Sequence, residues 1–141
     1  MNRLVLTFIS LIIYTGVALA GNAPAAAEAA LSEKFTKAED ITWEKESPNN
    51  FRAEFTLSGV KMWANFNQDG KWLQTKTAAK TSDLPNSVGD FVKKNFGTGV
   101  VQKVAKVERS TIDVVLYELE IKTGSKTSVE LVTADGRKIT E

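Results

Sequence analysis

The sequence predicts an α+β domain in which two tandem helix-plus-four-strand repeats form one antiparallel sheet, with the helices packed on one face. Three observations predict this fold class. The same succession of segments occurs twice, and Asp69-Gly70 returns as Asp135-Gly136 just before a final short strand. Two segments have apolar residues at the spacing of an amphipathic helix. The segments that follow each of them alternate apolar and polar residues, as half-buried strands do. We place repeat one at about residues 25–80 and repeat two at about residues 81–141.

The first twenty residues are predicted to be a signal peptide that does not belong to the fold. Arg3 supplies a positive charge, residues 4–17 are mostly apolar, and Ala18-Leu19-Ala20 forms a small-x-small cleavage site. The apolar stretch is short for a membrane span, which leaves an uncleaved anchor as the lesser alternative. We therefore expect cleavage after Ala20, a periplasmic or secreted protein, and a single mature domain at residues 21–141.

Each repeat is expected to begin with an amphipathic helix. Pro24 and Pro85 stand where helices can start, and Gly97 allows the left-handed backbone that ends the second one. The apolar residues recur at every fourth position: Ala27, Leu31 and Phe35 in the first helix, and Val88, Val92 and Phe96 in the second. Because this spacing makes a narrow apolar stripe, each helix is expected to lie on the sheet.

The remaining segments read as strands joined by short turns. Residues 51–57 alternate apolar and polar, and Ser58-Gly59 is a two-residue hairpin turn. Pairing Leu57 with Val60 then places every apolar side chain of the hairpin on one face, which sets the register. Residues 115–121 repeat the alternation, and a last strand is expected after Asp135-Gly136, which makes eight strands in total.

The composition argues against catalysis, cofactors and nucleic-acid binding. The chain has no Cys and no His, so it lacks disulfides, the commonest general base and the commonest metal ligand. Loss of Arg3 with the signal peptide leaves 17 basic and 17 acidic side chains, which gives no electrostatic footprint for nucleic acid or an anionic membrane. Glu118 and Glu120 lie on one side of a strand, but they are expected to be a solvated face paired with cations such as Lys126.

Residues 65–76 have part of the pattern of a calcium-binding loop, but no calcium site is expected there. The residues at its first positions have the required spacing, but Lys76 stands where a bidentate carboxylate is needed. A hairpin turn at residues 67–70 explains the same residues, because Asp-Gly tolerates the backbone of such turns. We expect no catalytic residues, no metal and no cofactor.

The candidate binding site is the face of the first repeat that points away from the helices. If Phe66 and Leu73 face the core, the outward residues include Arg52, Glu54, Lys61, Trp63, Asn65, Trp72 and Gln74. Trp and Arg dominate the energetics of protein interfaces, and the two Trp residues would be within diagonal reach. The alternative is that both Trp side chains merely cover the sheet or pack on a terminal segment. Trp43 is expected in the core between helix and sheet.

The order of these motifs resembles a known family. The relevant residues are Phe35, Ile41-Thr42-Trp43, Phe51, Phe55, Phe66, Asp69 to Leu73, Asp83-Leu84-Pro85, Tyr117-Glu118-Leu119 and Asp135-Gly136. The chain is similar to the PepSY-like, β-lactamase-inhibitor-like (BLIP-like) exported proteins of Gram-negative bacteria over residues 25–141. The resemblance implies paired helix-plus-sheet repeats, a periplasmic location, and inhibition or binding of an exported enzyme. It supplies no catalytic residues, and Lys138 stands in the second repeat where Trp72 stands in the first.

Together these points predict a non-enzymatic binding protein, in the role of an inhibitor or regulator of a periplasmic enzyme. The partner would be an exported protein such as a hydrolase or peptidase, with no nucleic acid and no membrane involved after signal cleavage. Two other functions stay open, a small-ligand or glycan sensor and a structural envelope domain. Exposed edge strands leave either a monomer or a homodimer.

Overall fold

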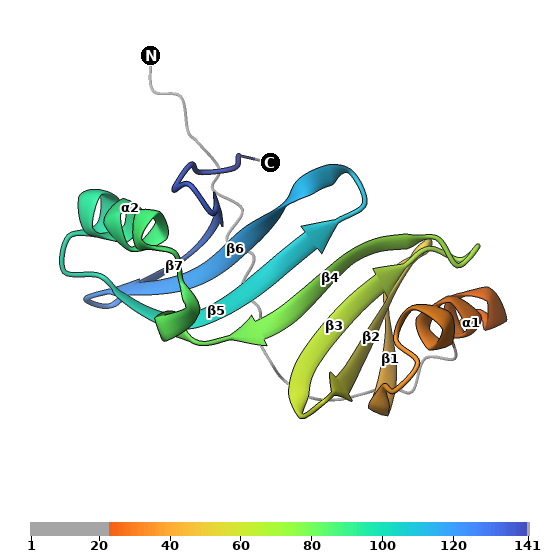
Figure 1. Cartoon of the computed structure of the whole chain (residues 1–141). Coiled ribbons are helices and arrows are strands. Elements are labelled where there is room, and N and C mark those ends of the chain that lie inside the picture. Colours follow the sequence, from red (N-terminus) through yellow and green to blue (C-terminus); the bar gives the residue numbers. More distant parts are fainter. Residues whose placement is uncertain (1–22, 141) are drawn as a thin grey trace, which may run out of the picture.

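A computed structural model describes residues 23–140, so the predicted signal peptide lies outside the described residues. The elements are α1 (Ala25–Lys34), β1 (Glu39–Ser47), β2 (Asn50–Leu57), β3 (Val60–Phe66), β4 (Trp72–Ala79), the 3-10 turn η1 (Thr81–Asp83), α2 (Asn86–Phe96), β5 (Val100–Arg109), β6 (Ile112–Thr123) and β7 (Lys126–Thr133). The strands form one open antiparallel sheet in the order β1-β2-β3-β4-β5-β6-β7 (Figure 1). This arrangement confirms the predicted α+β class with a single antiparallel sheet.

Both helices lie on the same face of the sheet, at opposite ends (Figure 1). α1 packs with β2 and β3 around Leu31, Phe55 and Phe66, and α2 packs with β5, β6 and β7 around Val88 and Leu119. The described residues thus have two apolar clusters, and the helices cover one side of the sheet only. We call the opposite side the open face.

The helix boundaries follow from the predicted signals. Pro24 and Pro85 are the N-cap residues of α1 and α2, and Gly97 closes α2 with φ +55°. Ala27 and Leu31 are buried, and the rings of Phe35 and Phe55 lie 4.8 Å apart between their centroids. None of the helices in the described residues is both long and apolar enough to span a membrane.

The β2–β3 hairpin has the register that the apolar alternation predicts. Leu57 pairs with Val60, and the ladder continues without a shift to the pair Phe51–Phe66. Ser58 and Gly59 both have positive φ, +51° and +78°, as a tight hairpin turn with the twist of the flanking strands requires. Trp43 packs on the core as predicted, with its ring 6.0 Å from that of Phe66.

The prediction of an eighth strand is wrong. After the Asp135-Gly136 turn, the described chain makes only one isolated bridge, between Val132 and Lys138. The turn is closed between Thr133 and Arg137 (2.9 Å from the Thr133 N–H to the Arg137 carbonyl oxygen), and the Ile139 N–H donates to the Leu131 carbonyl (2.8 Å). Among the described residues only 138–140 follow this turn, and they make a single bridge where a ladder needs consecutive ones. We call α1 with β1–β4 the first unit and α2 with β5–β7 the second unit, which therefore has three strands.

A β-bulge interrupts the pairing of β3 with β4 and changes the direction of Trp72. Asn65 pairs with Gln74, but the next pair is Phe66 with Trp72, so Leu73 is an extra residue. An extra residue reverses the alternation of side chains along a strand. Trp72 therefore shares a face with Phe66, on the helix side, and the predicted outward position of Trp72 is wrong.

Candidate functional site

Over β1–β4 the open face carries cross-strand rows of mostly polar side chains, whereas over β5 and β6 the row of Lys76 continues into the buried apolar residues Val107 and Leu116. Residues directly opposite each other in an antiparallel ladder share a face. One row joins Glu44, Arg52, Asn65 and Gln74, and the next joins Glu54, Trp63 and Lys76. Six of the seven predicted binding residues, Arg52, Glu54, Lys61, Trp63, Asn65 and Gln74, therefore share this face.

Trp63 lies on β3, beside the middle strand of the sheet, and its indole is held in place on the open face by Glu54. The Trp63 Nε1–H donates to Glu54 Oε2 (2.9 Å), and the other oxygen of the carboxylate pairs with Lys61. The Lys61 ammonium also lies 5.5 Å from the centre of the Trp63 ring. Burial by itself raises the pKa of Glu54, but the hydrogen bonds from Lys61 and Trp63 and the nearby charges outweigh it and lower that pKa below its usual value. Glu54 is thus ionised at neutral pH and fixes the indole.

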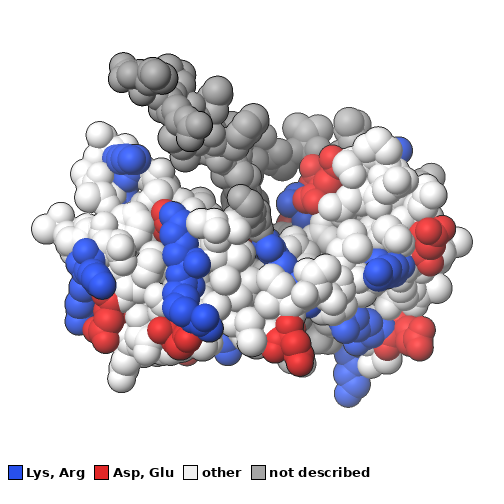
Figure 2. Space-filling model, turned by 90° about the horizontal axis from the view of Figure 1, so that it is seen from above, with Lys and Arg blue, Asp and Glu red and all other residues white. Residues whose placement is uncertain are grey.

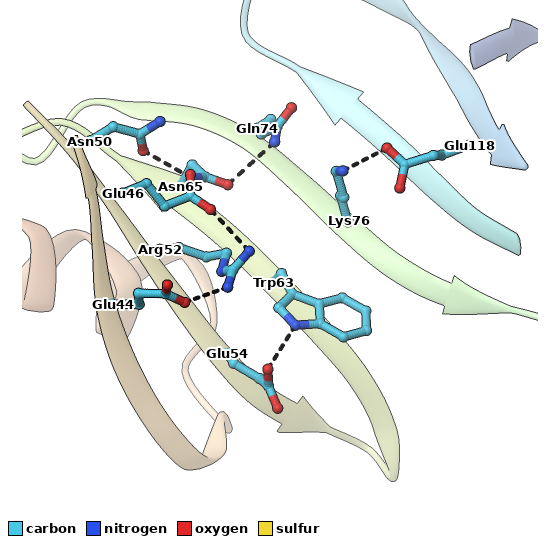
Figure 3. Close-up of polar contacts among 10 residues, drawn as sticks. All are labelled: Glu44, Glu46, Asn50, Arg52, Glu54, Trp63, Asn65, Gln74, Lys76 and Glu118. Atoms are coloured by element: carbon cyan, nitrogen blue, oxygen red, sulfur yellow. Dashed lines mark hydrogen bonds and ion pairs between the residues drawn. The ribbon is translucent and has the colours of Figure 1, made fainter. Parts of the chain in front are cut away.

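A second group of contacts links β1, β2 and β3. Arg52 bridges two carboxylates of β1, Glu44 and Glu46. Asn65, only 3% exposed, donates through Nδ2 to Glu46 Oε2 (2.8 Å) and to Asn50 Oδ1 (2.9 Å). Its own Oδ1 accepts from Gln74 Nε2 at 3.3 Å (Figure 3). These polar side chains therefore hold one another in place across β1, β2, β3 and β4.

Two ion pairs continue the open face onto the second unit. Lys76 on β4 reaches Glu118 on β6 (2.6 Å, Figure 3), and Lys103 on β5 pairs with Glu120 (3.2 Å). The partners of Glu118 and Glu120 are therefore these lysines, and the expected pairing with Lys126 is wrong. The sequence places Lys76 on this outward face with Gln74, although it was not among the predicted binding residues, and sequence reasoning missed Lys103.

A hollow of about 310 Å³ lies on the open face where the two units meet. Ala78 on β4 and Ala105 on β5 are directly paired, so methyl groups alone stand at this point of the two strands. Trp63 and the Lys76–Glu118 pair are among the residues that line the hollow. It forms because larger side chains surround two small ones.

Trp72 lies on the other side of the sheet, in a structural setting. Its ring packs against the α1 cluster, and the Lys34 ammonium lies 4.1 Å from the centre of that ring. Its Nε1–H donates to Oγ1 of Thr75, a residue that is 1% exposed. Trp63 and Trp72 are thus not a pair on one surface, which removes the two-Trp platform expected from the sequence.

The arrangement of titratable groups offers little for catalysis. The carboxylates of the open face are bound to cations, and no three acidic side chains among residues 23–140 converge on a common metal position. The segment with part of the calcium-loop pattern is a turn at residues 67–70. There the Asn67 Oδ1 accepts hydrogen bonds from the N–H groups of Asp69 (3.0 Å) and Lys71 (2.8 Å). Figure 2 shows Lys and Arg side chains lying beside Asp and Glu side chains on the surface in view.

The PepSY-like family, described as β-lactamase-inhibitor-like, matches residues 49–140. A protein from Bacteroides eggerthii described as periplasmic has a similar structure (TM-score 0.77, 22% identity, covering 85% of this chain and 88% of that chain). A DUF2874 family protein from Bacteroides uniformis has a TM-score of 0.76, 21% identity, and coverage of 84% and 88%. A BLIP-like protein from Bacteroides fragilis has a TM-score of 0.73, 20% identity, and coverage of 85% of each chain. No curated protein matches the sequence. The chain belongs to the PepSY-like, β-lactamase-inhibitor-like family.

Proposed function

We propose that this protein is an exported, non-enzymatic binding protein that uses the open face to recognise a partner protein in the periplasm. The observation that carries the proposal is Trp63, a half-buried aromatic side chain held by Glu54 on an ordered polar face. Trp and Arg are the residues that most often dominate interface energetics, and fixed side chains lose less entropy on binding. The periplasmic location is supported by the signal-peptide pattern at residues 1–20 and by the description of the Bacteroides eggerthii protein.

The role of inhibitor or regulator of an exported enzyme is the finer part of this proposal. It is supported by the family description and by the likeness to a BLIP-like protein, which at 20% identity concerns the fold. The paired carboxylates and the absence of His in the sequence favour binding over catalysis.

Affinity capture from a Gram-negative periplasmic extract tests the proposal, with tagged residues 21–141 as bait. Trp63→Ala removes the indole from the open face, and Lys106→Ala is the matched control because Lys106 shares the helix-side row of Thr77 and Tyr117. We expect a protein that the wild type and Lys106→Ala retain and that Trp63→Ala loses. Equal retention by Trp63→Ala would refute the open face as the binding surface. Capture of nothing above background would favour a structural envelope domain.

A small-ligand or glycan sensor is the second candidate, favoured by the hollow beside Trp63. Its volume of about 310 Å³ lies at the small end of the range for ligand sites. A glycan and metabolite binding screen on the same bait separates the two functions, since a sensor would bind a small molecule with no protein present.

We also propose that the two units are copies of one ancestral unit. Support comes from their Asp-Gly turns, which approach the two helices in the same way. An added Cβ would lie 2.5 Å from the Ala26 carbonyl oxygen at Gly70, and 2.6 Å from the Ser87 carbonyl oxygen at Gly136. A common origin explains why both units have this turn. Trp63 belongs to the first unit only, and a difference of this kind would specialise one copy for binding.

A further inference from the structure

We propose that the hollow on the open face receives an arginine side chain of the partner protein, between Trp63 and the carboxylates of Glu118 and Glu120. This inference rests on the proposed function and names the chemistry of the group that the open face recognises.

The floor and one wall suit the flat, apolar faces of a guanidinium group. Ala78 and Ala105 are paired across β4 and β5, and the Trp63 indole stands beside them on β3. The face of an aromatic ring carries negative electrostatic potential, so it attracts a cation and repels an anion. Trp63 already has the Lys61 ammonium 5.5 Å from its ring centre, which shows that the ring accepts a cation.

Equal numbers of positive and negative side chains line the hollow. Their placement therefore decides whether a positively or a negatively charged guest binds. Three carboxylates, Glu46, Glu118 and Glu120, face three cations, Arg52, Lys76 and Lys103. Arg52 is engaged with two carboxylates of β1. Its positive charge is therefore already neutralised and is not offered to an anionic guest.

The carboxylates of the second unit sit deeper in the hollow than the lysine at its rim. The Glu120 side chain is 25% exposed while its partner Lys103 is 60% exposed, at an Nζ–Oε2 distance of 3.2 Å. Glu118 and its partner Lys76 are both shielded, at 21% and 23% exposed, so the exposed cation of the two pairs is Lys103, and each carboxylate makes its ion pair through Oε2. An ion pair made by an exposed lysine such as Lys103 contributes little free energy, so a guest cation can displace that lysine from the carboxylate. An arginine can then bind a carboxylate with two N–H groups while it stacks on Trp63, a geometry that a lysine or a neutral side chain lacks.

Titration with capped tripeptides of sequence Gly-Xaa-Gly tests this inference directly. The probes have arginine, citrulline or glutamate at the central position, and the signal is the indole ¹H–¹⁵N peak of Trp63. Citrulline has the shape of arginine without its charge. We expect arginine to bind about fivefold or more tightly than citrulline, as a partly exposed ion pair and one cation–π contact provide. Equal binding of citrulline, or tighter binding of glutamate, would overturn the inference.

Substitution of the carboxylates provides the second arm. Glu118→Gln removes one charge and frees Lys76, so we expect it to lower arginine affinity about fivefold and to leave citrulline affinity unchanged. Glu120→Gln serves as a second variant if the first proves unstable, and unchanged arginine affinity in both would refute the inference. In the capture assay, loss of the partner by Trp63→Ala with full retention by both glutamine variants would refute the arginine guest and leave the proposed function standing. Retention by Trp63→Ala would refute the proposed function itself.

Discussion

Replacement of Gly70 by alanine probes the contact that fixes α1 on the sheet. Gly70 has φ +82°, and an added Cβ would lie 2.5 Å from the backbone oxygen of Ala26 in the first turn of α1. A left-handed conformation at an alanine costs about 1 kcal/mol. Relief of the overlap requires the turn and the helix backbone to move apart, and overpacking of this kind costs about 1–3 kcal/mol. We therefore expect Gly70→Ala to lower the free energy of unfolding by about 3 kcal/mol.

Gly124→Ala separates the two contributions. Gly124 also has positive φ, +61°, but an added Cβ would meet no atom within 4 Å. This variant should lose only the backbone contribution of about 1 kcal/mol. Thermal unfolding followed by circular dichroism should then show a fall in Tm of about 10 °C for Gly70→Ala and about 4 °C for Gly124→Ala. Equal losses in the two variants would refute the close approach of the turn to α1, and Gly136→Ala should behave like Gly70→Ala.

Three further predictions concern the two faces of the sheet. Trp72→Ala should lower the free energy of unfolding by about 2 kcal/mol or more in denaturant titration, because it removes a packed ring and leaves the buried Thr75 hydroxyl without its donor. Trp63→Ala should cost clearly less, and the reverse order would contradict the assignment of the faces. Asn65→Leu should destabilise the protein by about 1–3 kcal/mol, because the groups that Asn65 bonds lose their partner, and a neutral result would mean that the network is not stabilising. The lowered pKa of Glu54 means that its ionised form stabilises the fold above the ordinary Glu pKa, and this stability is lost as pH falls through the lowered value. Glu54→Gln should therefore be less stable than the wild type at pH 7, and the difference should shrink towards pH 3.

Local patterns predicted the first hairpin and the helix ends because each depends on neighbouring residues. The alternation of residues 51–57 with the Ser58-Gly59 turn leaves one register that buries every apolar side chain, and the structure has that register. Pro24, Pro85 and Gly97 act within one turn of helix, so their effect can be read without knowledge of the rest of the fold.

Two predictions of the fold were wrong, the outward position of Trp72 and the eighth strand. Trp72 and Leu73 are adjacent and both apolar, so either can face the core, and only the bulge opposite Asn65 and Phe66 decides between them. The Asp135-Gly136 turn reverses the chain as expected, but among the described residues the segment after it makes only the Val132–Lys138 bridge, so no eighth strand forms.

The part of the site that sequence reasoning missed depends on the order of the strands. Lys76 and Glu118 are 42 residues apart, and their side chains meet across β5. Their contact requires β4 and β5 to be neighbours, which joins the two units into one sheet. The open face of the first unit was predictable from alternation within one hairpin, whereas the hollow exists only once Ala78 and Ala105 are paired.

The indole signals of the three Trp residues test most directly whether the open face is the surface that binds the partner. The wild-type chain, labelled with ¹⁵N, is mixed with the partner recovered by affinity capture, and the indole ¹H–¹⁵N peaks are assigned from single Trp→Phe variants. Trp63 lies on the open face, while Trp43 and Trp72 pack on the α1 side. If the open face binds the partner, the Trp63 peak shifts or broadens at saturation while those of Trp43 and Trp72 stay in place. Perturbation of Trp72 with an unchanged Trp63 peak would contradict the open face as the binding surface.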